Sequence, residues 1–448
     1  MSLSVAERLA EAALAARPDA AMRRATARLL LDVVGLCVAA RHTDYIAPML
    51  AAAEAGTATA IGHARKFSAA DAALINGTAA HGEDFDDTFE GGPIHAGAVM
   101  VPAVLAAAER FGLSGEACLR GIAVGTEAAC RLSTVIPKAV HKAGFHPTSV
   151  FGTPAAALAV GTAMGLSRPD LAGAVGIAGS FASGIIEYLA EGAWTKRLHP
   201  GWAAQAGMRA AVLARERFFG PRTVFEGTHG LFHGFAHGQP ANWDALLAGF
   251  GSQWVAATIA FKPYAAGTMT QPYIDCARRL RATGIAPEQI AAIECETAEG
   301  ILHRLWEPLA AKQAPPNGYA AKFSVPYCVA AGFVLDDAGI AAFEDFLVAD
   351  ARLRALAAKV SYVVDPDNPY PRAYTGHVRV RLSDGRVAEE RQADLRGGAK
   401  DPLSDDELTR KFRANCLHGG WDAARADAAL AWIASAFDAT RPEVAALS

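Results

Sequence analysis

Residues 76–95 read NGTAAHGEDFDDTFEGGPIH, a polar stretch set within an apolar part of the chain. On either side the sequence consists almost entirely of Ala, Gly, Val and Leu. So many titratable groups between two apolar runs indicate more than a solvated surface, and the stretch is predicted to form one wall of an active site. Its acidic, imidazole and hydroxyl side chains are His81, Glu83, Asp84, Asp86, Asp87, Thr88, Glu90 and His95.

The first part of this stretch is predicted to be helical. The helix is predicted over 68–88, with Ser68 as its N-cap and Asp71 three positions on. A helix that continued to Thr88 would place His81, Asp84 and Thr88 on one face, because residues three and four apart are neighbours on a helix. The Gly-Gly-Pro sequence that follows predicts a loop over 89–97, which would carry the last histidine of the stretch.

Length and composition indicate a globular protein of two domains. The chain has 448 residues, of which 52% are hydrophobic and 20% charged, so it can build a large core. Its formal net charge of -4 argues against nucleic acid or an anionic membrane as the main partner. A small anionic substrate remains compatible with local basic sites.

The cysteines and the apolar segments predict a cytoplasmic protein. The seven cysteines are scattered and form no Cys-x-x-Cys pair, as expected of free thiols in a reducing compartment. The N-terminal residues lack the pattern of a secretory signal. The uncharged segment 147–167 is long enough for a membrane span, but it is rich in Ala, Gly and Thr and contains Pro154. It is therefore predicted to be a buried helix.

The pattern of elements predicts a mainly α fold with a large all-helical domain and a smaller α+β domain. Apolar helices rich in small residues are expected through the first part of the chain. Strands are expected over 289–297 and 358–365, with a hairpin that turns at Asp384-Gly385. The last helices are expected to pack back on the first domain. The predicted boundaries are 1–264 with 402–448 for the helical domain, and 265–401 for the smaller one. A loop is expected over 57–66, and helices over 98–112, 115–132, 150–165, 168–188, 201–218, 269–283, 323–334, 404–415 and 421–437.

No nucleotide-binding, zinc-protease or nucleophile-elbow motif occurs in the sequence. The acids and histidines of residues 81–95 are possible metal ligands, but their spacing matches no metal signature. We therefore predict neither a metal nor a cofactor.

Metal-free acid–base chemistry is the second interpretation. Histidine moves protons near neutral pH, and lysine pairs with carboxylates. Asp84 would orient a histidine or act as a base, and Thr88 would hydrogen-bond a substrate. Ordinary structural roles explain each residue equally well when it is taken alone, so the residues by themselves predict only a pocket of mixed charge. The further candidates lie in short polar segments: His95, His146, Lys196, Lys262 and Tyr327.

The sequence resembles the MmgE/PrpD family over nearly its whole length, with the blocks in order. The first block is Asn76-Gly-Thr-Ala-Ala-His81-x-x-Asp84-Phe-Asp86-Asp87-Thr88. The later blocks are Gly144-Phe-His146, Ser180-Phe-Ala-Ser-Gly, Lys196-Arg-Leu-His-x-Gly201, Phe261-Lys262-Pro-Tyr264, Lys322-Phe-Ser-Val-Pro-Tyr327, and Pro402-Leu-Ser-Asp-Asp-Glu-Leu with Lys411-Phe412.

The resemblance implies a homodimer with a metal-free site in the cleft between a helical domain and an α+β lid. The family's pocket residues carry over to Asp84, Thr88, His95, His146, Lys196, Lys262 and Tyr327. We predict catalytic roles for His95, His146, Asp84, Lys196 and Tyr327, and substrate binding by Thr88, Lys262, Lys196 and His81. The implied substrate is a small di- or tricarboxylate.

The family's activities share the loss or gain of a proton next to a carboxylate. They favour a cofactor-independent lyase, in the first place a dehydratase like 2-methylcitrate dehydratase. The alternatives are a dicarboxylate epimerase like iminodisuccinate epimerase, a decarboxylase of the cis-aconitate type, and a catalytically silent relative that binds an acid. Three departures from the family pattern concern the substrate: Glu90 in a longer loop, Ala96 after His95, and the segment 265–271. A carboxylate at Glu90 would repel a tricarboxylate if it pointed inward.

Overall fold

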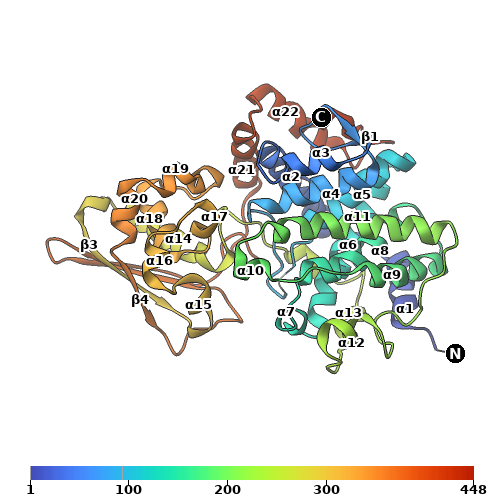
Figure 1. Ribbon diagram of the computed structural model, residues 1–448, viewed down its shortest axis with the longest axis horizontal. Helices are drawn as coiled ribbons and strands as arrows, with labels where there is room; N and C mark the ends of the chain where they lie inside the picture. The colour runs from blue at the N-terminus through green and yellow to red at the C-terminus, as the bar shows by residue number, and fades with distance from the viewer. Residues whose placement is uncertain (1, 93) are drawn as a thin grey trace. The chain divides into compact units, whose positions relative to one another are not determined.

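The computed structural model describes residues 2–92 and 94–448. The chain forms two compact units (Figure 1). The first contains Met1–Gly82, Asp86–Ala260 and Asp406–Ser448. The second contains Glu83–Phe85 and Phe261–Asp405. The predicted fold class, a large helical domain with a smaller α+β domain, is confirmed.

The first unit is built almost entirely of helices. One small antiparallel sheet joins β1 (Ala55–Thr59) to β2 (Lys66–Phe67), where the sequence predicts only a loop. The principal helices are α1 (Val5–Ala15), α2 (Ala20–Ala40), α3 (Ala47–Ala52), α4 (Ala69–Gly82), α5 (Gly97–Phe111), α6 (Gly115–Val135), α7 (Ala139–Lys142), α8 (Pro147–Ala163), α9 (Arg168–Phe181), α10 (Tyr188–Glu191), α11 (Thr195–Arg215), α12 (Leu231–Ala236), α13 (Trp243–Leu247), α21 (Asp405–His418) and α22 (Ala423–Ser435).

Small residues let the helices around the core approach closely. Helix α8 is buried along its whole length and packs against α5, α6, α9 and α11 (Figure 1). A Cβ atom on Gly77 of α4 would lie 2.6 Å from the Cα atom of Gly201 on α11. A Cβ atom on Gly207 would lie 2.4 Å from that of Ala156 on α8. The polar ends of α4 and α11 are thereby fixed next to the start of α8.

The last helices pack on the start of the chain. Lys411 of α21 places its Nζ atom 2.6 Å from Oδ1 of Asp32 on α2, and both side chains are buried. A Cβ atom on Gly35 would lie 2.9 Å from the ring of Phe412, so this contact also requires a small residue. Residues more than 370 positions apart are thus joined in one core.

The second unit contains a four-stranded sheet in the order β4-β3-β5-β6. Strand β3 runs parallel to β4 and antiparallel to β5, and β5 runs antiparallel to β6. Gly385 has φ +90° in the turn of the predicted hairpin, a conformation that favours glycine. Its main elements are α14 (Gln271–Ala282), β3 (Ile290–Thr297), α18 (Val325–Val334), α20 (Ala351–Ala357), β4 (Val360–Val364), β5 (Gly376–Leu382) and β6 (Val387–Gln392).

The predicted helix over 68–88 is wrong at its C-terminal end. It begins as expected, with the N–H of Asp71 donating to Oγ of Ser68 at 3.1 Å. It ends at Gly82, and Asp84 has a left-handed φ of 57°. If the helix continued, the carboxylates that follow Gly82 would lie at the negative end of the helix dipole, which is unfavourable. Outside the helix, these carboxylates reach hydrogen-bond donors. The expected common face of His81, Asp84 and Thr88 therefore does not form.

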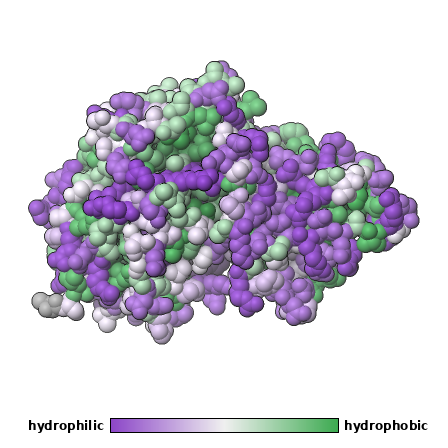
Figure 2. Space-filling model, turned by 180° about the vertical axis from the view of Figure 1, so that it is seen from behind, coloured by the Kyte–Doolittle hydropathy of each residue, from purple (hydrophilic) through white to green (hydrophobic). Residues whose placement is uncertain are grey.

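In the described part of the chain, no helix is both long and apolar enough to cross a membrane. The face of the molecule in Figure 2 intermixes hydrophilic and hydrophobic residues.

Candidate active site

The turn after α4 brings an acid back onto the helix end. Nδ1 of His81 lies 2.7 Å from Oδ2 of Asp86, and both side chains are fully buried. An ionised carboxylate accepts the Nδ1 hydrogen and leaves a lone pair on Nε2 when the imidazole is neutral. Among the described residues, no hydrogen-bond partner reaches this buried Nε2 atom.

His95 has a tautomer that is fixed by the backbone. Its Nδ1 atom lies 2.7 Å from the carbonyl oxygen of Asp87. A carbonyl oxygen can only accept, so Nδ1 carries a hydrogen and Nε2 carries the lone pair of the neutral ring. The backbone N–H of His95 donates to Oγ1 of Thr148 at 3.2 Å. The side chain remains 12% exposed, so it is the more open of the two imidazoles near Asp86.

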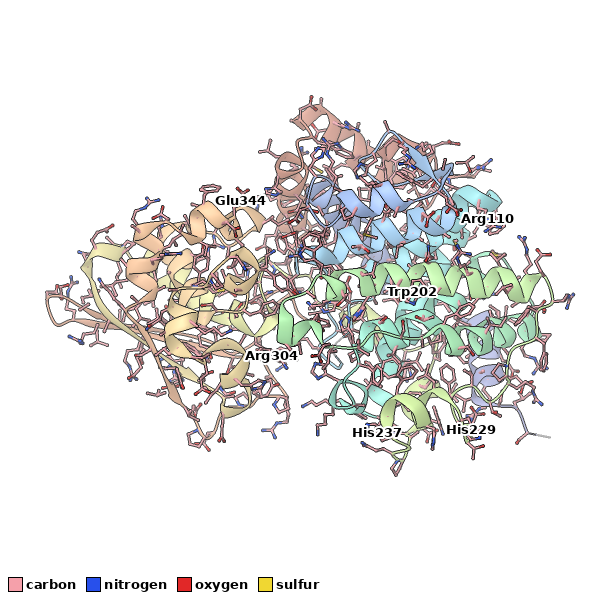
Figure 3. All side chains as sticks on the ribbon, viewed as in Figure 1. Arg110, Trp202, His229, His237, Arg304 and Glu344 are labelled. Carbon is pink, nitrogen blue, oxygen red and sulfur yellow. The ribbon has the colours of Figure 1, made fainter. Side chains whose placement is uncertain are left out.

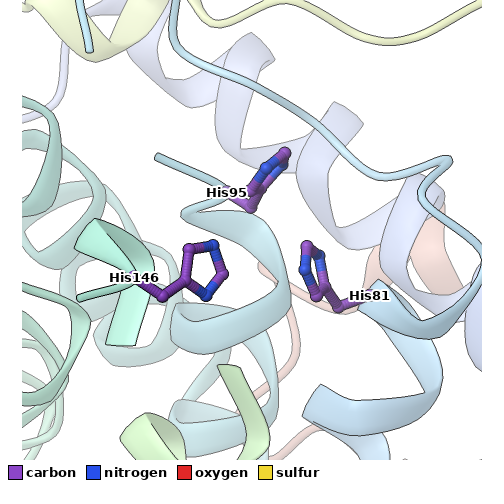
Figure 4. Close-up of side chains that lie close together, drawn as sticks. All are labelled: His81, His95 and His146. Carbon is purple, nitrogen blue, oxygen red and sulfur yellow. The ribbon is translucent and has the colours of Figure 1, made fainter. Parts of the chain in front are cut away.

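A third imidazole completes a cluster at the start of α8 (Figure 4). The ring of His146 lies 5.7 Å from that of His81 and 6.3 Å from that of His95, measured between centroids. The rings of His81 and His95 are 4.8 Å apart. His146 occupies the N-cap position of α8, and its backbone N–H donates to the carbonyl oxygen of Gly184 at 2.8 Å. Segments from four parts of the first unit therefore meet here.

His146 also contacts a residue that the sequence analysis did not select. Its Nδ1 atom lies 3.1 Å from Nδ1 of His199 on α11. Burial is the main cause that lowers the pKa of His146 well below its usual range, and the neighbouring His81, His199, Lys196 and His95 lower it further. Burial, together with His81 and Lys196, lowers the pKa of His199 to about 4. Both imidazoles are neutral near pH 7.

Lys196 stands in the first turn of α11, three residues before His199. Residues at this spacing share a helix face, and the cation lowers the pKa of both His146 and His199. Lys196 therefore places a positive charge beside these two imidazoles and disfavours their protonation.

A second buried carboxyl group lies beside Asp86. Oδ1 of Asp87 accepts the backbone N–H of Gly97 at 2.9 Å, at the start of α5. Burial first, and then the charge of Asp86, raise the pKa of Asp87 well above its usual range. The adjacent Thr88 is buried and pairs through its backbone with Ala260.

The second unit holds the other predicted site residues. Nζ of Lys262 donates to the backbone oxygen of Asp84 at 2.8 Å and lies 3.4 Å from its Oδ1 atom. Lys322 makes the corresponding contact with Glu83, at 2.7 Å from Oε2. The hydroxyl group of Tyr327 donates to the carbonyl oxygen of Ala342 at 2.6 Å, and burial raises its pKa.

The predicted residues thus fall into two groups. His81, Thr88, His95, His146 and Lys196 lie in the first unit, where the three histidines form one cluster. Asp84, Lys262 and Tyr327 lie in the second unit, where Asp84 and Lys262 are paired.

Sequence reasoning did not assign roles to Asp86 and His199, which contact the cluster directly. The signal for His199 was available in its spacing from Lys196. Glu90, which would oppose a tricarboxylate if it pointed inward, is exposed.

The cluster has the donor set of a metal site. One ligand atom from each of His81, His95 and His146 lies within 4.8 Å of the others. Three imidazoles suit zinc or another transition metal. Lys196 contributes a positive charge close to His146, whereas Asp86 contributes a carboxylate next to His81 and His95. The cluster therefore combines possible metal ligands with charges of both signs.

Comparisons with known proteins agree over both units. The model of the MmgE/PrpD N-terminal domain matches residues 4–244, and that of the MmgE/PrpD C-terminal domain matches residues 264–433. A cis-aconitate decarboxylase-like protein of Aspergillus oryzae is 27% identical over 86% of this chain and 84% of its own length. The cis-aconitate decarboxylase of Mus musculus is 31% identical over 77% and 71%. A 2-methylcitrate dehydratase of Cupriavidus necator is 25% identical over 56% and 54%.

Proposed function

The chain belongs to the MmgE/PrpD family, and from this premise we propose that it is a cofactor-independent lyase, in the first place a dehydratase, of a small di- or tricarboxylic hydroxy acid. The observation that carries the proposal is the cluster of buried imidazoles beside Lys196. Neutral imidazoles supply bases, and the lysine supplies charge for a carboxylate.

The removal of a proton next to a carboxylate requires a base. His95 donates through Nδ1 to the carbonyl oxygen of Asp87, which leaves Nε2 as the basic nitrogen of its neutral form. His146 is neutral at pH 7, because its pKa is lowered. The electron pair left on carbon spreads into the carboxylate as an enolate-like charge, which Lys196 would stabilise.

Dehydration also requires an acid that protonates the departing hydroxide. A cluster with more than one imidazole supplies both groups, because one ring can accept a proton while another delivers one. The proposed roles of Asp84, Lys262 and Tyr327 rest on the family resemblance alone.

A decarboxylase is the second candidate, because the relatives from Aspergillus oryzae and Mus musculus have names that refer to cis-aconitate decarboxylase. Loss of carbon dioxide leaves a carbanion that must be protonated. In that case the cluster would act as an acid, and the first task of Lys196 would again be to hold a carboxylate.

Proton NMR in deuterated water tests both candidates. The purified protein is incubated with 2-methylcitrate, citrate, cis-aconitate, iminodisuccinate, tartrate and malate. A new vinylic signal from a hydroxy acid supports the dehydratase, and release of carbon dioxide supports the decarboxylase. Deuterium entering an α-position without a new product contradicts the lyase and favours an epimerase.

A matched pair of variants ties any turnover to the cluster. His95→Asn is expected to reduce the rate by about 100-fold or more, the usual contribution of a general base. His237→Asn is the control, because His237 is exposed and lies beyond the end of α12 (Figure 3). It has a left-handed backbone, which asparagine tolerates. Equal rates in both variants, or no turnover of any acid by the wild type, would contradict the proposed function.

A further inference from the structure

The contact between His146 and His199 constrains where their protons lie. Their Nδ1 atoms face each other at 3.1 Å. A neutral imidazole has one N–H group and one lone pair. Two N–H groups at this distance would repel, and so would two lone pairs. A hydrogen bond forms only when one Nδ1 atom carries hydrogen and the other does not, so the two rings have opposite tautomers.

Both rings are held in the neutral form that this argument needs. Burial is the main cause of the lowered pKa of each. The titratable groups close to them are His81 at the end of α4, His95, and Lys196 on α11, and all of these lower the pKa of His146. Tyr188 of α10 contacts both rings, at 6.4 Å from His146 and 5.8 Å from His199 between centroids.

Gly184 holds the pair in place from the other side. Its carbonyl oxygen accepts the backbone N–H of His146. Its φ of +113° is a conformation that side chains rarely adopt. A Cβ atom there would lie 2.6 Å from Cβ of Ser149 and 3.4 Å from Nδ1 of His199. A side chain at this position would therefore collide with Ser149 in the first turn of α8, next to His146.

We propose that His146 and His199 form a proton relay, in which the proton between their Nδ1 atoms decides whether Nε2 of His146 is a base or an acid. The proposal rests on the proposed function and names a residue that carries protons for it. When Nδ1 of His146 carries hydrogen, its Nε2 has a lone pair and takes a proton from the substrate carbon.

The electron pair of that C–H bond stays on the substrate as the enolate-like charge. The Nδ1 proton of His146 then crosses to Nδ1 of His199, whose Nε2 proton leaves to water. The pair is now in the opposite arrangement, with hydrogen on Nε2 of His146. That group protonates the departing hydroxide, the Nδ1 proton of His199 returns to Nδ1 of His146, and Nε2 of His199 regains a proton from water. Both rings are then back in their starting tautomers, and the products are an alkene and water.

The first test needs no substrate. Full-length protein with ¹⁵N-labelled histidine is examined by long-range ¹H–¹⁵N NMR near pH 7, with assignments from His146→Gln and His199→Asn. The expected result is opposite tautomers for the two rings, or joint averaging between the two arrangements. His199→Asn is expected to change the ¹⁵N shifts of His146. Identical tautomers for the two rings, or ¹⁵N shifts of His146 that are the same in the wild type and in His199→Asn, would overturn the relay.

The second test separates proton transfer from simple hydrogen bonding. An asparagine at position 199 can turn its amide to bond either tautomer of His146, but it cannot pass a proton on. We expect kcat to fall about 100-fold in His199→Asn, while KM changes less than about twofold. The pH profile of kcat should also lose one ionisation. Activity within threefold of wild type would show that only the hydrogen bond matters and would refute the relay.

His237→Asn again serves as the matched control, with circular dichroism to confirm that each variant folds. If the wild type turns over none of the acids tested, the proposed function fails. The NMR experiment on the wild type then decides the state of the pair by itself.

Discussion

Nδ1 of His81 lies 2.7 Å from Oδ2 of Asp86, although helix α4 ends between the two residues. The same carboxylate oxygen lies 3.7 Å from Nδ1 of His95. One buried acid therefore faces two imidazoles of the cluster from the same side. Its negative charge favours hydrogen on the Nδ1 atoms and lone pairs on the Nε2 atoms.

Replacing Asp86 by asparagine is expected to lower kcat at least about tenfold, because an amide can donate to Nδ1 and select the wrong tautomer. Steady-state kinetics with the active acid measure this. Asp87→Asn is the matched control. Burial raises the pKa of Asp87 well above its usual range, and an amide oxygen can still accept the N–H of Gly97.

The free energy of unfolding should change by only about 1 kcal/mol in Asp87→Asn. The raised pKa of Asp87 means that its contribution to stability is lost as pH rises through that pKa. The asparagine side chain does not titrate, so the free energy of unfolding of Asp87→Asn should rise relative to that of the wild type as the pH increases. Equal losses of kcat in both variants would show that the pair acts only through packing.

Lys196 is expected to set the acidic limb of the pH profile. Its charge lowers the pKa of His146, so Lys196→Met should raise that pKa and move the acidic limb of kcat/KM to higher pH. It should also raise KM, because a cation for the substrate carboxylate is lost. Lys196→Arg keeps the charge and should keep the limb in place. A limb that stays fixed in Lys196→Met would contradict this assignment.

The stability of the protein should fall in mild acid. The lowered pKa of His199, about 4 against an unfolded value of 6.5, means that the unfolded chain binds more protons between these limits. Stability therefore falls as pH drops below 6.5 and levels off near 4, with a loss of roughly 3 kcal/mol at most from this residue. Urea unfolding at several pH values measures this loss. The free energy of unfolding of His199→Asn should depend less steeply on pH than that of the wild type, and an equally steep dependence would contradict the assignment.

Removing metal should leave activity unchanged. In the proposed function, the three histidines of the cluster act as bases and acids and not as metal ligands. Dialysis against EDTA or 1,10-phenanthroline is expected to keep kcat within about twofold, since the proposed bases need no metal. A loss of activity that zinc or another divalent ion restores would refute the metal-free proposal.

Replacing only one member of the pair of Lys262 and Asp84 should destabilise the protein. Both side chains are nearly inaccessible to solvent. Lys262→Met removes the buried cation that lies 3.4 Å from Oδ1 of Asp84 and should destabilise the protein by about 3 kcal/mol. Lys262→Met combined with Asp84→Leu should recover much of this loss in thermal unfolding. A single variant as stable as wild type would show that Asp84 has other adequate partners.

The fold was predictable wherever the pattern was local. Apolar spacing gave the helices of the core, and Asp384-Gly385 gave the hairpin turn. The end of α4 was not predictable, because Asp84 leaves the helix towards Lys262, which lies 178 residues further along the chain. The residues next to Asp84 in the sequence do not indicate that Lys262 is its partner.

The site shows the same division. The histidines stood out as polar residues in apolar sequence, whereas the contact between His146 and His199 spans 53 residues and depends on how α8 and α11 pack. The spacing from Lys196 places His199 on the same helix face as that lysine. This spacing does not show that His199 contacts the ring of His146.

Residues 83–85 leave the helical unit for three positions, and their lysine partners at 262 and 322 come from the second unit. Neither unit can therefore be exchanged as a self-contained module. A chimera that replaces residues 261–405 with the corresponding part of a relative inherits a foreign partner for Glu83 and Asp84. A chimera that keeps these ion pairs must therefore exchange residues 83–85 together with residues 261–405.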